Sequence, residues 1–124
     1  MFKVYHYAML TETERNRLNG PDGGWDSEPR FSRYADITSF GKKDAVIKGL
    51  LEGEYHAVAV VKFNNMEDVF RFTNHIEDDW TKNPAVTAIP CKGYRSTSVG
   101  DLIENCETGE IFIVAGCGFE PLAA

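Results

Sequence analysis

The segment 54–63 constrains the fold of this chain more than any other, because five consecutive apolar residues stand at its centre, at positions 57–61. A nearly continuous apolar run of this length is typical of an inner strand whose two faces are both covered. Helical patterns lie on either side of it along the chain, over residues 42–52 and 66–79. This succession of helix, strand and helix predicts a sheet with helices packed against it.

The pattern over 66–79 is the clearest helical signal in the chain, and Asn65 precedes it in the position of a helix N-cap. The side chains expected to face the sheet are those of Met66, Val69, Phe70, Thr73, Ile76 and Trp80. We therefore predict that Phe70 and Trp80 are buried, and that Arg71 and His75, on the opposite side of the helix, are exposed.

The remaining elements are expected to be short. Thr11 with Glu14 forms a capping-box pattern, which predicts a helix that ends near Asn19. Residues 20–38 hold two prolines, several glycines and three aromatic residues without a regular period, and they predict a long loop with its own aromatic anchors. Further strands are expected over 2–10, 85–89, 102–104 and 110–115, with a hairpin turn at 107–109 and a short tail at the end.

Together these patterns predict a single α+β domain over residues 1–124, with a mixed or antiparallel sheet of about five strands and two or three helices packed on it. Hydrophobic residues make up 43% of the chain and charged residues 26%, which matches ordinary globular domains and argues against disorder. The sequence shows no internal repeat and no linker.

The chain is acidic, with 13 basic and 19 acidic residues and a formal net charge of −6. Binding to nucleic acid depends on neutralising phosphates, so nucleic-acid binding is not expected except through a local basic patch. The longest apolar run is too short to span a bilayer, and no signal peptide is recognisable. These features predict a cytoplasmic protein that does not bind membranes.

Cysteine and histidine residues give no metal or disulfide signature. Cys91, Cys106 and Cys117 stand outside any CxxC or Cys/His ligand spacing, and we expect them to be free thiols. The histidines at positions 6, 56 and 75 are expected to be ordinary strand and surface residues. No catalytic residue, metal ligand or cofactor is predicted.

One candidate binding site lies near the end of the helix predicted over 66–79. Asn74 and His75 on the polar side of this helix, together with Trp80 and with Asn83 after its end, could line a shared pocket there. The alternative is that Asn74 is solvated, Trp80 belongs to the core and Asn83 caps the chain reversal. Both interpretations fit the pattern.

A second candidate is the polar turn from Arg95 through Ser96, Thr97 and Ser98 to Asp101. Turn amides, hydroxyls and a guanidinium all donate hydrogen bonds, so such a turn is able to hold an anion. Ser and Thr side chains also bond to their own backbone in turns, and Asp101 could close the same turn.

The placement of Arg95 distinguishes these interpretations. We predict that Arg95 lies within reach of Asn74 or Asn83, and that its guanidinium either pairs with Asp101 or points into a cleft bordered by Trp80. The first arrangement is a structural staple with satisfied hydrogen bonds, and the second is an open anion site.

The C-terminal half of the chain also resembles a known group of sequences. The residues that carry the resemblance are Phe72–Ile76, Trp80–Asn83, Val86, Arg95–Asp101 and Gly118–Phe119. This pattern is similar to small uncharacterised proteins of bacteriophages and plasmids. The resemblance implies no activity, and it implies a setting in the bacterial cytoplasm during phage infection.

The sequence leaves more than one class of function open. The first is a non-enzymatic accessory protein of a phage or mobile element, which binds a host or phage macromolecule, most readily a protein. The alternative is a small-molecule or nucleotide-binding domain, with or without catalysis, that uses the turn from Arg95 to Asp101 as an anion site. Nucleic-acid binding through a local patch is a third.

Overall fold

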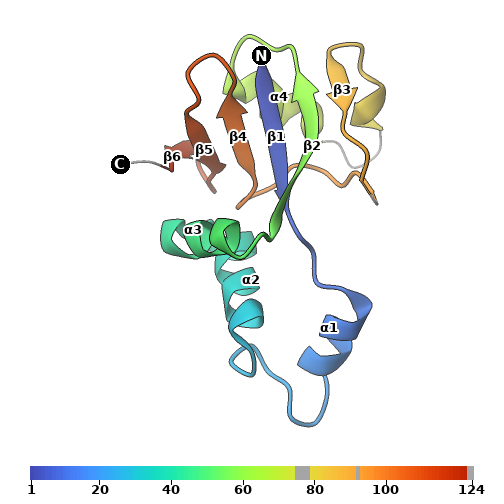
Figure 1. Ribbon diagram of the computed structural model, residues 1–124, viewed down its shortest axis with the longest axis vertical. Helices are drawn as coiled ribbons and strands as arrows, with labels where there is room; N and C mark the ends of the chain where they lie inside the picture. Colours follow the sequence, from blue (N-terminus) through green and yellow to red (C-terminus); the bar gives the residue numbers. More distant parts are fainter. Residues whose placement is uncertain (75–78, 92, 123–124) are drawn as a thin grey trace.

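The structure is a computed structural model that describes residues 1–74, 79–91 and 93–122 (Figure 1). The strands of this part of the chain are β1 (Phe2–Tyr7), β2 (Tyr55–Val61), β3 (Val86–Ala88), β4 (Leu102–Asn105), β5 (Ile111–Val114) and β6 (Phe119–Pro121). They form one sheet in the order β3-β2-β1-β4-β5-β6, in which every neighbouring pair is antiparallel. The predicted α+β fold is confirmed, with six described strands instead of about five.

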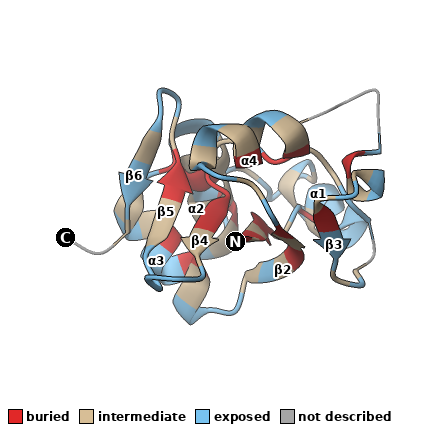
Figure 2. Ribbon diagram, turned by 90° about the horizontal axis from the view of Figure 1, so that it is seen from above, coloured by how far each residue is buried: buried red, intermediate tan, exposed pale blue. Residues whose placement is uncertain are grey.

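Helices cover both faces of this sheet. The helices of the described residues are α1 (Glu12–Leu18), α2 (Pro29–Phe40), α3 (Lys43–Leu51), α4 (Met66–Thr73) and the 3-10 helix η1 (Trp80–Lys82), of which α2, α3 and α4 pack on the sheet. Val69 of α4 belongs to one apolar cluster with Val4 of β1, while Ile37 of α2 and Val46 of α3 belong to another with Tyr7. Figure 2 shows the buried residues gathered on the strands that lie between α4 and α3. No helix in the described ranges has both the length and the apolar character needed to cross a membrane.

The central strand β1 contributes to both clusters. Successive side chains of a strand point to opposite faces of the sheet, so Phe2 and Val4 face α4 whereas Tyr5 and Tyr7 face α2 and α3. By the same alternation His6 falls on the α4 face, where its ring meets the ring of a tryptophan in η1.

The interpretation of residues 20–38 as one long loop is wrong for its second half, because α2 begins at Pro29. Proline at the first helical position has a suitable φ and lacks only an N–H that would have no partner within the helix. Phe31 and Ile37 are fully buried and supply the apolar face of α2. Trp25, in the preceding loop, keeps about half of its surface exposed.

The helix predicted over 66–79 is shorter than expected. α4 ends at Thr73, with Asn74 as its C-cap, and η1 begins at Trp80. The Thr73 carbonyl oxygen accepts a hydrogen bond from the amide of Thr97, so this helix end is joined to the polar turn. His75, with Ile76, lies outside the described residues.

The burial predicted for this region is confirmed at two of its three described positions. Trp80 is buried and Arg71 is exposed. Phe70 is only partly buried, because it packs at the margin of the cluster, where its ring meets that of Phe119 edge to face. The apolar face of α4 is therefore centred on Val69.

The expected C-terminal tail forms the strand β6 instead. A turn at Gly118, with a φ of +83° that favours glycine, reverses the chain and pairs Phe119 with Val114 of β5. Both outer strands of the sheet are three residues long, and prolines interrupt them: Pro84 and Pro90 flank β3, and Pro121 ends β6. Short edges with proline leave few backbone groups free for pairing with another strand.

Candidate functional site

The polar turn from Arg95 to Asp101 lies against the end of β1. β1 pairs with β4 as far as Tyr5 and Leu102. Beyond that point the side chain of Asp101 accepts a hydrogen bond from the Tyr7 amide at 2.8 Å, and Arg95 Nη2 donates to the Tyr7 carbonyl oxygen at 2.9 Å. An arginine and an aspartate thus take the place of pairing with β4 at the end of β1, whose other edge stays paired with β2.

Arg95 and Asp101 form a bidentate pair in which Nη1 meets Oδ2 and Nη2 meets Oδ1, both at 2.7 Å. Asp101 is fully buried, and it also accepts the Ser98 amide at 2.8 Å. Arg95 Nη1 makes further hydrogen bonds to the Ser96 carbonyl oxygen and to Ser98 Oγ. The structure therefore has the first of the two expected arrangements, in which the guanidinium and a turn amide serve a protein carboxylate.

Of the other predicted site residues, Trp80 contacts the polar turn and Asn83 does not. Trp80 Nε1 donates to the Arg95 carbonyl oxygen at 3.1 Å, so η1 is attached to the turn. Asn83 instead caps the start of β3, where its Oδ1 accepts the Ala85 amide. Neither Asn74 nor Asn83 is among the hydrogen-bond partners that the described part of the chain provides for Arg95.

His6 is a site residue that the sequence analysis missed. It is 1% exposed, and its Nε2 lies 2.9 Å from Thr97 Oγ1, while its ring packs edge to face against Trp80. Burial lowers the pKa of His6 to about 4, against the opposing effect of the Asp101 carboxylate. His6 is therefore neutral at pH 7. The alternation along β1, which places His6 on the face of Val4, is the signal that could have identified it.

A pocket of about 610 Å³ opens where β1 leaves the sheet. Its lining residues are His6, Tyr7, Ala8, Met9, His56, Gly93, Tyr94 and Arg95. Three separate parts of the chain therefore form its walls: the end of β1, His56 at the start of β2, and the segment that leads into the polar turn. The volume lies within the range of small-ligand sites.

Two exposed apolar side chains line this pocket, and a third is linked to one of them through Tyr34. Met9 is 52% exposed and Tyr94 is 36% exposed, and both line it. Trp25 is 50% exposed and stacks on Tyr34 with the two rings nearly parallel, while the Tyr34 hydroxyl donates to the Met9 sulfur. We call Met9, Trp25, His56 and Tyr94, together with the pocket, the β1-end surface.

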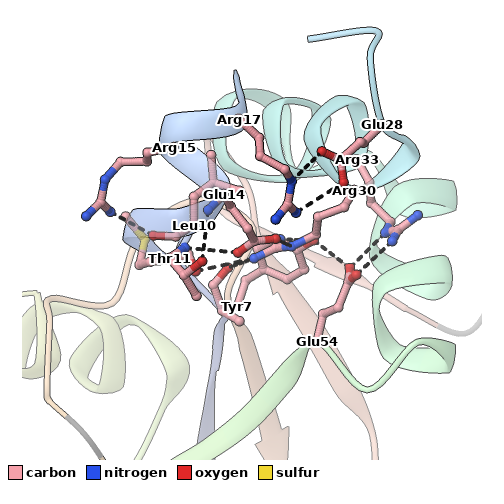
Figure 3. A network of polar contacts seen from close by, with 12 residues as sticks. Tyr7, Leu10, Thr11, Glu14, Arg15, Arg17, Glu28, Arg30, Arg33 and Glu54 are labelled. Carbon is pink, nitrogen blue, oxygen red and sulfur yellow. Dashed lines mark hydrogen bonds and ion pairs between the residues drawn. The ribbon is translucent and has the colours of Figure 1, made fainter. Parts of the chain in front are cut away.

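A network of arginines and glutamates supports the other side of the β1 end (Figure 3). Arg30 donates to the Tyr7 hydroxyl at 2.6 Å and to the Ala8 carbonyl oxygen at 2.7 Å, and it forms an ion pair with Glu14. Arg33 holds Glu54 with two hydrogen bonds of 2.7 Å. The network joins α1 and α2 to the end of β1 and fixes the backbone that forms one wall of the pocket.

The hydrogen bonds and burial of Tyr7 and Glu54 determine the protonation states of these two side chains. Burial raises the pKa of Tyr7 to about 12, helped by the Glu54 carboxylate, which accepts a hydrogen bond from the Tyr7 hydroxyl. Burial opposes ionisation of Glu54, but hydrogen bonds from Arg33 and Tyr7 outweigh it and hold the Glu54 pKa below its usual value. Tyr7 is thus neutral and Glu54 ionised at pH 7, as their hydrogen bonds require.

Within the described ranges, no group of three or more His, Cys, Asp and Glu side chains is placed to hold a metal ion. Comparisons of the chain with protein-family models, with curated proteins and with solved structures find no match. The geometry of the β1-end surface is therefore the basis on which a function is proposed.

Proposed function

We propose that this protein is a non-enzymatic binding module that engages another protein through the β1-end surface. The observation that carries the proposal is that Met9 and Tyr94 line one pocket and that Trp25 is linked to Met9 through Tyr34, while all three of Met9, Trp25 and Tyr94 expose a third to a half of their surface. Tryptophan, tyrosine and methionine are enriched at protein interfaces, where a few aromatic anchors around a pocket supply most of the binding energy.

The charges of the site favour a protein over an anionic ligand. The guanidinium of Arg95 is neutralised by Asp101, and that of Arg30 is paired with Glu14. A phosphate would have to compete with these carboxylates, which are already held by the fold. The net charge of −6 adds long-range repulsion toward polyanions.

The setting we propose is that of an accessory protein of a phage or mobile element in the bacterial cytoplasm, with a host or phage protein as the partner. The resemblance of the C-terminal half to small phage and plasmid proteins supports this setting. The proposed setting is also consistent with an acidic single domain. The proposed binding surface, however, includes residues 9, 25 and 56, which lie outside the part of the chain that carries the resemblance.

Cross-linked capture of partners from a bacterial lysate tests the proposal when variants are compared side by side. Trp25→Ala and Tyr94→Ala remove apolar area from the β1-end surface. Phe40→Ala and Leu51→Ala remove side chains that are 69% and 78% exposed on α2 and α3, and they serve as matched controls.

We expect a partner that the native protein and both controls retain, and that both β1-end variants lose. Equal retention by all five proteins would contradict the proposal, as would a loss confined to the α2 and α3 variants. Circular dichroism of each variant checks that the fold is kept.

Binding of a small molecule or nucleotide is the second candidate function. Its supporting observation is the pocket itself, whose volume of about 610 Å³ suits a small ligand and whose wall includes Arg95. A thermal-shift screen with nucleotides and phosphorylated metabolites tests it. A rise in melting temperature that Arg95→Ala abolishes would favour this candidate over protein binding.

A further inference from the structure

Among the residues that the structure describes, the lining of the β1-end pocket carries little net charge at neutral pH. Arg95 contributes a guanidinium to the wall, but both of its terminal nitrogens contact the buried carboxylate of Asp101. His6 is buried and neutral. A charged group that entered the pocket would lose its hydration without meeting an uncompensated opposite charge from either residue.

Several polar atoms around the pocket already have partners within the protein. The carbonyl oxygens of Tyr7 and Ala8 accept hydrogen bonds from Arg95 and Arg30. His6 Nε2 is bonded to Thr97, and the Tyr94 hydroxyl donates to the Ile89 carbonyl oxygen at 2.7 Å. A strongly polar guest would have to displace these bonds, and an unpaired buried polar group is costly.

What the pocket offers instead is aromatic and polarisable surface. The rings of His56 and Tyr94 and the thioether of Met9 line it, and each of these side chains is exposed to solvent. Aromatic rings pack favourably on other rings and on methionine sulfur, beyond the gain from burial alone. Trp25 and Tyr34, stacked on each other beside Met9, extend this surface outside the pocket.

From this combination we infer that the β1-end pocket receives an uncharged aromatic side chain of the partner protein. The inference rests on the proposed function and names the chemistry of its central contact. An aromatic group gains from the ring and thioether contacts, whereas a lysine, a carboxylate or a phosphate loses hydration and gains no free partner among Arg95, His6 and the two carbonyl oxygens.

The test uses the full chain labelled with ¹⁵N and a titration with four probes. N-acetyl-tryptophanamide represents the aromatic guest, N-acetyl-lysinamide and N-acetyl-aspartate amide represent charged ones, and inorganic phosphate represents an anion. We follow the amide signals of Ala8, Met9 and Tyr94 at the pocket. The amide of Gly109, in the turn between β4 and β5, reports non-specific effects.

We expect N-acetyl-tryptophanamide to shift the pocket signals and leave Gly109 unchanged, with an affinity at least about tenfold higher than that of the charged probes, a difference of about 1.4 kcal/mol. Tyr94→Ala should weaken this binding, and Phe40→Ala should not. Shifts centred on the Arg95 and Ser98 amides with phosphate, equal binding of the charged probes, or aromatic binding at α2 and α3 instead would each overturn the inference.

The same probe separates failure of the inference from failure of the proposed function. If partner capture depends on Trp25 and Tyr94 but the aromatic probe neither binds the pocket nor competes with the partner, protein binding stands and the inferred contact is wrong. If the probe binds the pocket while capture is the same in all variants, the pocket chemistry is supported and the proposed function is wrong.

Discussion

Asp101 is the fully buried member of the ion pair that it forms with Arg95. Removing a charge from water costs several kcal/mol, and a buried ion pair balances this cost only with good geometry and further hydrogen bonds. Asp101 has both, through Arg95 and through the amides of Tyr7 and Ser98. The loss of one partner leaves the other charge uncompensated.

Asp101→Asn should therefore lower the free energy of unfolding by about 3–5 kcal/mol. The amide keeps the shape of the side chain but removes the negative charge that Arg95 faces. Asp36→Asn is the control, because the Lys42–Asp36 pair is exposed and should contribute less than about 1 kcal/mol. Urea unfolding measures both, and a loss below about 1 kcal/mol for Asp101→Asn would contradict this account.

His6 should make the stability of the protein sensitive to mild acid. Its pKa is about 4 in the folded state and 6.5 without the fold, so between these values the unfolded chain binds the additional proton. The contribution of neutral His6 is complete above pH 6.5 and decreases as the pH falls toward 4. Between pH 7.5 and 5.5 the free energy of unfolding should decrease by about 1.4 kcal/mol.

Urea titrations at several pH values check this prediction. His56→Gln, which removes an exposed histidine, should keep the decrease, and His6→Gln should lose it even where its stability at pH 7.5 is lower. The same pH dependence in His6→Gln would show that another group titrates.

At the level of elements, the turn that leads into β4 requires glycine for two reasons. Gly100 has a φ of +90°, and a Cβ added there would clash with the Ile37 carbonyl oxygen in α2. Gly109 also has a positive φ, +77°, but open space around it. The two glycines thus share the backbone conformation and differ in the close approach.

Gly109→Ala should cost about 1–2 kcal/mol of unfolding free energy, from backbone strain alone. Gly100→Ala should cost at least about 2 kcal/mol more, because backbone atoms of α2 must move. Thermal or urea unfolding compares them directly. Equal losses would mean that α2 yields easily and that its contact with the turn is loose.

The segment 11–28, which holds α1, is attached to the domain mainly by polar contacts. α1 has no buried residue, and Figure 1 shows it projecting from the sheet. Arg30 of α2 contacts the segment through its ion pair with Glu14, and it fixes the chain just before the segment through its bonds to the Ala8 and Met9 carbonyl oxygens. Local opening of this segment should therefore need far less free energy than global unfolding.

Arg30→Ala should increase the rate of tryptic cleavage after Arg15 or Arg17 at least about tenfold, because local opening becomes easier. Arg71→Ala, which removes an exposed arginine from α4, is the control and should leave the rate unchanged. Mass spectrometry of the products identifies the cut. An unchanged rate in Arg30→Ala would show that the stacking of Trp25 on Tyr34 holds the segment.

The elements that sequence predicted well are those whose packing is local and periodic. The strand around 57–61 and the start of α4 are confirmed, because their apolar residues follow the period of the element. α2 was missed because only Phe31 and Ile37 are buried along its twelve residues. β6 was missed because three residues carry no period, and pairing with β5 alone defines it.

Only the contacts of the candidate site that join residues close together in the sequence could be predicted. Arg95 and Asp101 are only six residues apart, so the residue types of one turn were enough to include their pairing among the arrangements predicted from the sequence. The contacts with Tyr7 and His6 join residues more than eighty positions apart. They depend on how β1 and the turn meet in three dimensions, which no local pattern encodes.

At the scale of the whole molecule, the sheet is built around the strand that comes first. β1 pairs with β2 across roughly 50 residues of sequence and with β4 across roughly 100, as in the pair of Val4 with Ile103. Closing such long loops before contacts form slows folding. Both core clusters, one on each face of the sheet, include residues of β1 and of the strands next to it.

Refolding from denaturant should therefore take milliseconds to seconds, in the range of domains with non-local pairing. Stopped-flow fluorescence follows it, because the buried Trp80 changes environment on folding. Completion within microseconds would contradict the topology described here.

The position of β1 also determines what a growing chain experiences on the ribosome. With about 95 residues between β1 and β4, synthesis at about 5–20 residues per second leaves one side of β1 without its partner for about 5–20 s. Throughout that time Phe2, Val4 and Tyr7 belong to a strand with an open edge, which is the form most prone to pair with other chains. A product that stops before residue 102 retains this edge permanently, so interrupted synthesis should yield aggregates or substrates for proteases and chaperones.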